Sequence, residues 1–226
     1  AEENELAFCR AAQAEVYLRA NEFNLAEAIT QKNLLFYQET PDIGGQVHAL
    51  NTIGIINLRR GKIAEAKKHL TASAALGRKI LDARKLIVPL NYLGDIACNE
   101  GEYQEAEQLF EESLKIASNL EDLYQMAIVI NNLASVYHVS MQFHKANDMY
   151  ARSLTICRQI GDQLGEAIAL SNMGEVALAL ENDSLAISLF EKALKISRDI
   201  EEDWSISICL NNLAQTACKV GRHEQA

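Results

Sequence analysis

A pattern of six residues returns in this chain at an unbroken interval of forty residues. It reads ALNTIG from Ala49, PLNYLG from Pro89, VINNLA from Val129, ALSNMG from Ala169 and CLNNLA from Cys209. A fixed period without insertion or deletion is typical of a solenoid, in which each unit packs only against its neighbours. The interval therefore restricts the chain to a stack of similar units.

Each unit is predicted to be a pair of helices. In its first half, apolar residues recur at spacings of three and four, as Leu50, Ile53 and Ile56 do, which places them on one face of a helix. The second half opens with a turn residue and reaches an alanine, as in GKIAEA from Gly61. The chain has 11 glycines and 2 prolines in 226 residues, so helix breakers are scarce.

Columns of small and acidic residues predict how these helices meet. The second helix carries an alanine in every repeat: Ala26, Ala66, Ala106, Ala146, Ala186 and Ala226. The first helix carries a small residue: Gly54, Gly94, Ala134, Gly174 and Ala214. Glycine costs a helix up to about 1 kcal/mol relative to alanine, so its return indicates a steric demand. An acidic column is read as capping the first helix: Asp42, Asp82, Asp122, Asp162 and Glu202.

Turn and breaker residues predict the ends of the first helices. Gly61, Gly101 and Gly221 stand where a left-handed C-cap is expected, and Met141 takes the place of glycine in the fourth repeat. Pro89 falls inside a predicted helix, where it removes one backbone donor and is expected to kink or delay that helix.

The pattern resembles the tetratricopeptide repeat. The shared features are the L-x-x-L/M-G/A core of the first helix, the G-x-Y/F-x-x-A opening of the second, and the later aromatic residue and leucine. The usual period of that family is about 34 residues. The forty-residue period is similar to a longer variant, found in bacterial regulatory ATPases such as maltose-regulator-like activators, in spindle-orientation adaptors and in kinesin light chains. The resemblance implies an all-α fold, a right-handed α-solenoid of antiparallel helix pairs.

Blocks of forty residues that begin at Leu6 divide the chain as a single array over 1–226. They give five full repeats over 6–205 and a truncated sixth over 206–226. The sixth lacks most of its second helix, and the first helix of a repeat would expose an apolar face without that partner. We therefore expect the sequence to be a piece of a longer protein, or its C-terminal end to self-associate.

Two polar columns lie on the face of the first helix that is turned away from the second. One reads Asn51, Asn91, Asn131, Ser171 and Asn211, and the next reads Thr52, Tyr92, Asn132, Asn172 and Asn212. Asparagine is a mediocre helix former, but its amide can pair with the backbone of an extended peptide. The alternative is that these amides bond across adjacent helices and order the stack. The sequence leaves both interpretations open, and the first column lies nearer the packing face.

The resemblance places a partner-binding site on this face. In peptide clamps of the family, an asparagine one residue before the helix leucine contacts the ligand, and Asn132, Asn172 and Asn212 hold that position here. The other residues expected on the face are Asn91, Tyr92, Asn131, Asp95, Glu175, Arg59 and Asn99. Carboxylates mixed with apolar residues favour an aliphatic and basic peptide, or a neighbouring domain of the same protein.

Composition excludes several functions. The net charge of −10 and the absence of a lysine and arginine cluster argue against nucleic acid as a partner of this region. No apolar run approaches the roughly 18 residues of a membrane span. No motif of a nucleotide-binding loop, zinc protease or hydrolase occurs, and no Cys/His set has zinc spacing, so no enzyme activity, cofactor or metal is expected. Five cysteines in helical stretches are read as buried or half-buried thiols, which fits a reducing cytoplasm.

The sequence thus favours a non-enzymatic module that binds a protein or peptide within a larger regulatory or scaffold protein. Two other functions fit the same pattern. The array could sense a small effector molecule for a signal-transduction ATPase or transcription regulator, or it could be a structural, self-associating spacer. Thermal shifts with metabolites but not with peptides would favour the first, and a concentration-dependent mass without a captured partner would favour the second.

Overall fold

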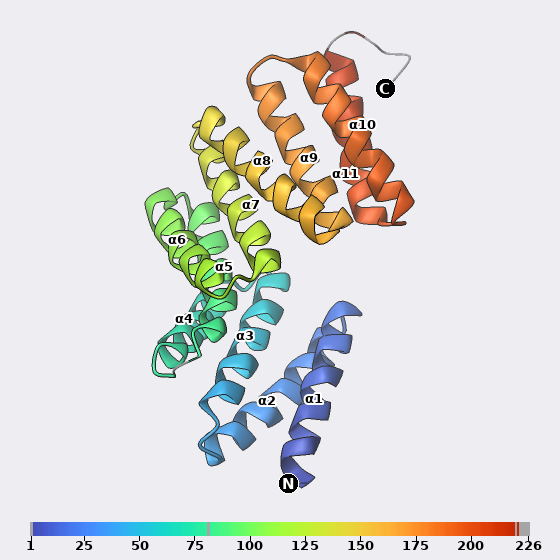
Figure 1. Ribbon diagram of the computed structural model, residues 1–226. Coiled ribbons are helices and arrows are strands. Elements are labelled where there is room, and N and C mark those ends of the chain that lie inside the picture. The colour runs from blue at the N-terminus through green and yellow to red at the C-terminus, as the bar shows by residue number, and fades with distance from the viewer. Residues whose placement is uncertain (1, 81, 220, 222–226) are drawn as a thin grey trace. The chain divides into compact units, whose positions relative to one another are not determined.

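The computed structural model describes residues 2–80, 82–219 and 221, and in this part of the chain the fold is all-helical (Figure 1). In chain order the eleven described helices are α1 (Glu2–Arg19), α2 (Phe23–Glu39), α3 (Ile43–Arg59), α4 (Ile63–Gly77), α5 (Arg84–Glu100), α6 (Tyr103–Asn119), α7 (Leu123–Val139), α8 (Phe143–Ile160), α9 (Gln163–Ala179), α10 (Asp183–Asp199) and α11 (Asp203–Lys219). They pack as consecutive antiparallel pairs, which confirms the predicted all-α repeat array. We call the odd-numbered helices A helices and the even-numbered ones B helices.

The contacts divide the chain into two compact units, residues 1–116 and 117–226. Within the first unit, consecutive helices from α1 to α5 pack on one another, and α3 also touches α1 and α5. Within the second unit, consecutive helices from α7 to α11 pack on one another, and α9 also touches α7 and α11. Each unit thus has a layer of A helices in mutual contact. One continuous right-handed superhelix stays a prediction, and the helix that would complete the sixth repeat, with Ala226, lies outside the described residues.

The small residues of the sequence mark the contact between A and B helices. The alanines of the B-helix column are completely buried: Ala26, Ala66, Ala106, Ala146 and Ala186. A Cβ atom added to Gly94 would lie 2.7 Å from the ring of Phe110, and one added to Gly174 would lie 2.5 Å from the ring of Phe190. The A-helix glycines therefore make room for a large side chain from the B helix, which confirms the predicted steric demand.

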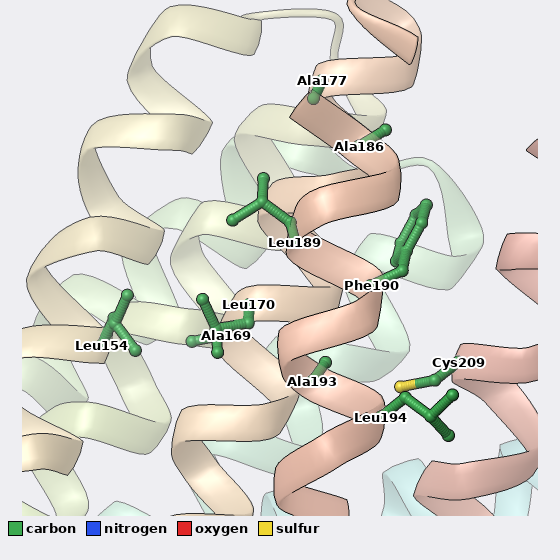
Figure 2. Packing of buried hydrophobic residues seen from close by; sticks show 10 residues of the cluster. All are labelled: Leu154, Ala169, Leu170, Ala177, Ala186, Leu189, Phe190, Ala193, Leu194 and Cys209. Atoms are coloured by element: carbon green, nitrogen blue, oxygen red, sulfur yellow. The ribbon is translucent and has the colours of Figure 1, made fainter. Parts of the chain in front are cut away.

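The core of the second unit shows this packing (Figure 2). Leu189, Phe190 and Leu194 of α10 pack with Leu170 of α9 and with Cys209 of α11 in one buried cluster. Burying one such large side chain stabilises the fold by about 1.5–3 kcal/mol. The B helix is thus held between the A helix of its own repeat and the A helix of the next.

The acidic column caps three A helices as predicted. The carboxylates of Asp42, Asp122 and Asp162 accept hydrogen bonds from the backbone N–H groups of Gly45, Gln125 and Gly165, at 2.8, 3.1 and 2.9 Å. Asp82 lies one residue before Ala83, the N-cap residue of α5, and its carboxylate accepts a hydrogen bond from the backbone N–H of Arg84, the first residue of that helix, at 3.2 Å. This A helix contains Pro89 and begins and ends one residue later in its repeat than α3 and α7 do.

The left-handed ends of the A helices are confirmed and extend beyond the glycines. Positive φ angles occur at Asn21 (60°), Gly61 (73°), Gly101 (84°), Met141 (61°), Glu181 (60°) and Gly221 (74°). The left-handed region costs a residue with a Cβ atom roughly 1–2 kcal/mol. Met141 is 78% exposed, so little packing offsets that cost.

Replacing Met141 with glycine is therefore expected to raise the free energy of unfolding by about 0.5–1 kcal/mol. The gain is smaller than the strain because glycine has more freedom in the unfolded chain. Urea titration of both proteins measures it, and Asn21→Gly is the control with a smaller expected gain, because asparagine tolerates this region. A loss of stability would show that the Met141 side chain has a packing role.

The cysteines are only partly as predicted. Cys157 and Cys209 are buried and Cys98 is half-buried, but Cys9 and Cys218 are exposed. The expectation of buried or half-buried thiols is wrong for these two, which lie on α1 and α11, the first and last of the described helices. Among the residues described, no helix combines the length and the apolar character that crossing a membrane requires.

Candidate ligand-binding faces on the A helices

Two asparagines of the first column, Asn51 and Asn91, are buried. Asn51 is 7% and Asn91 is 9% exposed, and within the described part of the chain the Oδ1 atom of each has no hydrogen-bond partner. Asn131, by contrast, is half-buried, and Asn211 is exposed. A buried acceptor without a partner costs about 1–3 kcal/mol, so these two amides are not placed there for stability alone.

The second column bridges neighbouring A helices. The Asn172 amide donates from Nδ2 to Oδ1 of Asn131 at 3.1 Å, and the Asn212 amide donates from Nδ2 to Oε1 of Glu175 at 3.2 Å. These bonds join α7 to α9 and α9 to α11, so part of this column orders the stack. Each of these asparagines is only half-buried. An amide has two donor hydrogens and an acceptor, so one bond leaves groups for a ligand.

A hollow of about 410 Å³ opens on the A helices of the first unit. Its walls are formed by Glu15, Leu18, Arg19, His48, Asn51, Thr52, Ile55, Arg59, Val88 and Tyr92, which come from α1, α3 and α5. Thr52 is buried and its hydroxyl donates to the carbonyl of His48 at 3.1 Å. The hollow therefore combines apolar side chains, a buried amide and charged side chains.

The electrostatics of this hollow are set by burial. Burial raises the pKa of Asp95, on α5, to about 6. Burial also raises the pKa of Tyr92, with a further rise from the Asp95 carboxylate and an opposing effect of Arg59. The pKa of His48 is lowered by burial, although Glu15, whose carboxylate lies 3.9 Å from the ring, opposes the change. The predicted residues Asp95 and Arg59 thus both lie within electrostatic range of Tyr92.

A smaller hollow, of about 150 Å³, lies between α7, α8 and α9 of the second unit. Its lining is Ala127, Ile128, Asn131, Asn132, Ser153, Cys157, Asp162, Gly165 and Ile168. The first repeat has Tyr37 and Gly45 at the places of Cys157 and Gly165, and a Cβ atom on Gly45 would lie 2.4 Å from the Tyr37 ring. The sulfur of Cys157 is far smaller than that ring, so this repeat keeps a space beside the asparagines.

The structure groups most of the predicted site residues but not all. Arg59 and Tyr92 share the first hollow, Asn131 and Asn132 share the second, and Glu175 meets Asn212. Asn99 is exposed at the end of α5 and lines neither hollow.

Two groups of functional candidates were missed in the sequence. Leu18 and Ile55 of the first hollow are among them, and so are Cys157 and Gly165 of the second. The signal available in the sequence was that Cys157, next to the small residue Gly165, stands where the first repeat has the large residue Tyr37. Within the described residues, no three His, Cys, Asp or Glu side chains are grouped so that they could hold a metal ion.

Comparison with known proteins identifies the repeat. The sequence model of the tetratricopeptide repeat family matches residues 46–119, 85–159, 125–199 and 165–226. No curated protein sequence gives a significant match.

Solved structures share the fold at low sequence identity. BtubC (BKLC) from P. vanneervenii is 17% identical, with 97% of this chain and 86% of that chain covered and a TM-score of 0.73. A signal transduction ATPase with numerous domains from Pyrococcus horikoshii, which has a tetratricopeptide repeat sensor, is 17% identical, with 95% and 33% covered and a TM-score of 0.73. A Rap protein complexed with Competence and Sporulation Factor is 15% identical, with 98% and 73% covered and a TM-score of 0.71.

Proposed function

Because the chain belongs to the tetratricopeptide repeat family, we propose that its A-helix faces bind an extended segment of a partner protein without catalysis. Domains of this family are generally protein-binding. The Rap protein, which shares the fold, is complexed with Competence and Sporulation Factor, so an array of this fold accommodates a ligand. The partner segment belongs to another protein or to another domain of the same chain.

The observation that carries the proposal is the pair of buried asparagine oxygens without partners. Asn51 is nine-tenths buried, lines the first hollow and has an unpaired Oδ1 atom. Turning the amide about its Cβ–Cγ bond exchanges oxygen and nitrogen, so either can face the hollow. An extended peptide has a backbone N–H donor on almost every residue. Such a donor would satisfy the amide and remove the cost of leaving it unpaired.

The second unit supports the same function with a different surface. Asn132 and Asn131 stand beside the smaller hollow, whose other walls include Ile128 and Ile168. Amide groups beside an apolar hollow fit a peptide, which has a polar backbone and projecting side chains. Asn172 and Asn212 are expected to contact the segment with the groups that their bonds between helices leave unused.

A small-molecule effector is the second candidate, favoured by the size of the first hollow. Its volume of about 410 Å³ falls in the usual range of ligand pockets, about 300–1,000 Å³. The structurally similar ATPase from Pyrococcus horikoshii carries its repeats as a sensor. Thermal unfolding with panels of metabolites and of peptides separates the two functions, because only a ligand of the folded state raises the midpoint.

A leucine in place of Asn51 tests the proposal. Leucine has a similar branched shape but no polar atom, so the free energy of unfolding is expected to rise by about 1–2 kcal/mol. The affinity for a peptide selected from a phage-displayed random library against the parent protein is expected to fall about tenfold. Urea titration and fluorescence anisotropy measure the two quantities.

The matched control is Asn147→Leu on the B helix α8, which is expected to leave peptide affinity unchanged. A loss of stability in Asn51→Leu would show that the amide makes a structural hydrogen bond. An unchanged affinity would show that the peptide binds elsewhere.

A further inference from the structure

We infer that the hollow of the first unit binds an acidic side chain of the partner segment, through Arg19 and Arg59, beside an apolar side chain. This inference rests on the proposed function and names the chemistry of the ligand. Both arginines line the same hollow, one from the last turn of α1 and one from the last turn of α3. They occupy the same position of the repeat, forty residues apart.

Neither of these arginines is neutralised by a carboxylate among the described residues. In the described part of the chain, Arg19 and Arg59 make no side-chain hydrogen bond or ion pair. Four other arginines are paired with carboxylates, Arg60 with Glu27, Arg78 with Glu112, Arg84 with Asp82 and Arg158 with Glu166, whereas Arg10, Arg152 and Arg198 show no carboxylate partner among the described residues and line neither hollow. The chain has a net charge of −10, so unpaired guanidinium groups on one hollow do not result from a shortage of carboxylates.

The fold itself does not demand a cation at this position. A positive charge in the last turn of a helix interacts favourably with the helix dipole, which would be a purely structural reason for an arginine. The same position holds Asn99, Val139 and Ala179 in the next three repeats, and those A helices form without a cation; in α11 it holds Lys219, which is paired with Asp183. Helix stability therefore does not account for the two arginines, which differ from Lys219 in lining a hollow and in having no carboxylate partner among the described residues.

The carboxylates nearest to the hollow do not neutralise the pair. The Glu15 carboxylate lies 3.9 Å from the His48 ring and forms no ion pair with either arginine. Burial alone accounts for the raised pKa of Asp95, and no nearby cation opposes that rise. A carboxylate on the ligand could accept hydrogen bonds from both guanidinium groups, which is the strong, charge-assisted kind of bond.

The remaining walls define what accompanies the acidic group. Leu18, Ile55 and Val88 present apolar surface, and Tyr92 adds an aromatic ring. With the Asn51 amide available for a backbone group, the hollow fits a peptide in which an aspartate or glutamate adjoins a large apolar residue. This differs from the aliphatic and basic peptide expected from the sequence. That expectation was based on the carboxylates of Asp95 and Glu175, which lie in different units. It did not include a hollow lined by two arginines.

Peptide selection on the full chain tests the inference. A phage-displayed random library selected against the parent protein is expected to yield peptides enriched in aspartate and glutamate next to apolar residues. Fluorescence anisotropy then compares one selected peptide with analogues in which each acidic residue is replaced by glutamine or lysine. The Arg19→Gln/Arg59→Gln protein is expected to bind the acidic peptide at least about tenfold more weakly and to lose its preference over the glutamine analogue.

Two further variants serve as a control and as a charge reversal. Arg78→Gln, which removes an arginine paired with Glu112 on another surface, is expected to bind like the parent. Arg59→Glu is expected to bind the lysine analogue better than the acidic peptide, because the charge at the contact is reversed. Circular dichroism of each variant shows whether its helices are intact.

The outcomes separate this inference from the function on which it rests. Selected peptides that are neutral or basic, or an affinity that the arginine variants leave unchanged, would overturn the acidic ligand and leave peptide binding standing. A library that yields no peptide would overturn both. Binding of free glutarate, without binding of any acidic peptide, would overturn the peptide ligand in favour of a small anionic effector.

Discussion

Replacing Phe190 with alanine is expected to lower the free energy of unfolding by about 3–5 kcal/mol. The ring is completely buried and fits over Gly174, where even one added carbon atom would lie 2.5 Å from it. Truncation removes the buried ring and leaves a cavity, since the backbones of α9 and α10 are held by the rest of the cluster (Figure 2). Leu185→Ala on the same helix, at a side chain that is 48% exposed, is expected to cost much less.

The location of the loss is as informative as its size. In a repeat array each unit is stabilised mainly by its neighbours, so amide hydrogen exchange in Phe190→Ala should accelerate most in α9, α10 and α11. The helices α1 to α4 should change little. A loss below about 1 kcal/mol, or equal acceleration in every helix, would contradict the assignment of Phe190 to the core of its repeat.

Replacing Asp95 with asparagine is expected to change how stability depends on pH. Burial raises the pKa of this carboxyl from its ordinary 3.8 to about 6 in the folded protein. The group is neutral in both the folded and the unfolded state below about pH 4 and ionised in both above about pH 6. Because the folded state holds the proton more tightly, ionisation of the group lowers the stability of the folded state. The parent chain therefore loses the contribution of Asp95 as the pH rises from about 4 to 6, by up to about 3 kcal/mol.

The asparagine variant should keep that stability, because it cannot ionise. Urea titrations of both proteins at intervals from about pH 3.5 to pH 8 measure the difference. It should be near zero at the acidic end, grow between about pH 4 and pH 6, and stay constant above. A difference that does not vary with pH would mean that the substitution acts through packing and that Asp95 titrates normally.

The paired helices were predictable because their signals are local and repeated. The apolar spacing of three and four needs only one helix, and the alanine column needs only one helix pair, so Ala106 and its equivalents were placed correctly. The helix caps were placed correctly at Asp42, Asp122 and Asp162 for the same reason. Asp82 also accepts a backbone N–H of the first turn, that of Arg84, although Ala83 is the N-cap residue of its helix.

The state of each asparagine could not be predicted, because it depends on the repeat next to it. Asn51 and Asn91 are buried without partners for Oδ1, whereas Asn172 reaches Asn131 across two A helices. The hollows depend on side-chain volumes from separate helices, as the comparison of Tyr37 with Cys157 shows. The same pattern of columns is compatible with a filled space between the helices and with an open one. Only the packed structure distinguishes the two cases.

Binding of a partner segment to the A-helix faces is tested most directly by a crystal structure of the chain with a selected peptide. We expect the peptide in the first hollow, with a backbone group within hydrogen-bond distance of the Asn51 amide and an acidic side chain between Arg19 and Arg59. A peptide seated on the B helices, or an Asn51 amide bonded only to its own chain in the complex, would contradict this.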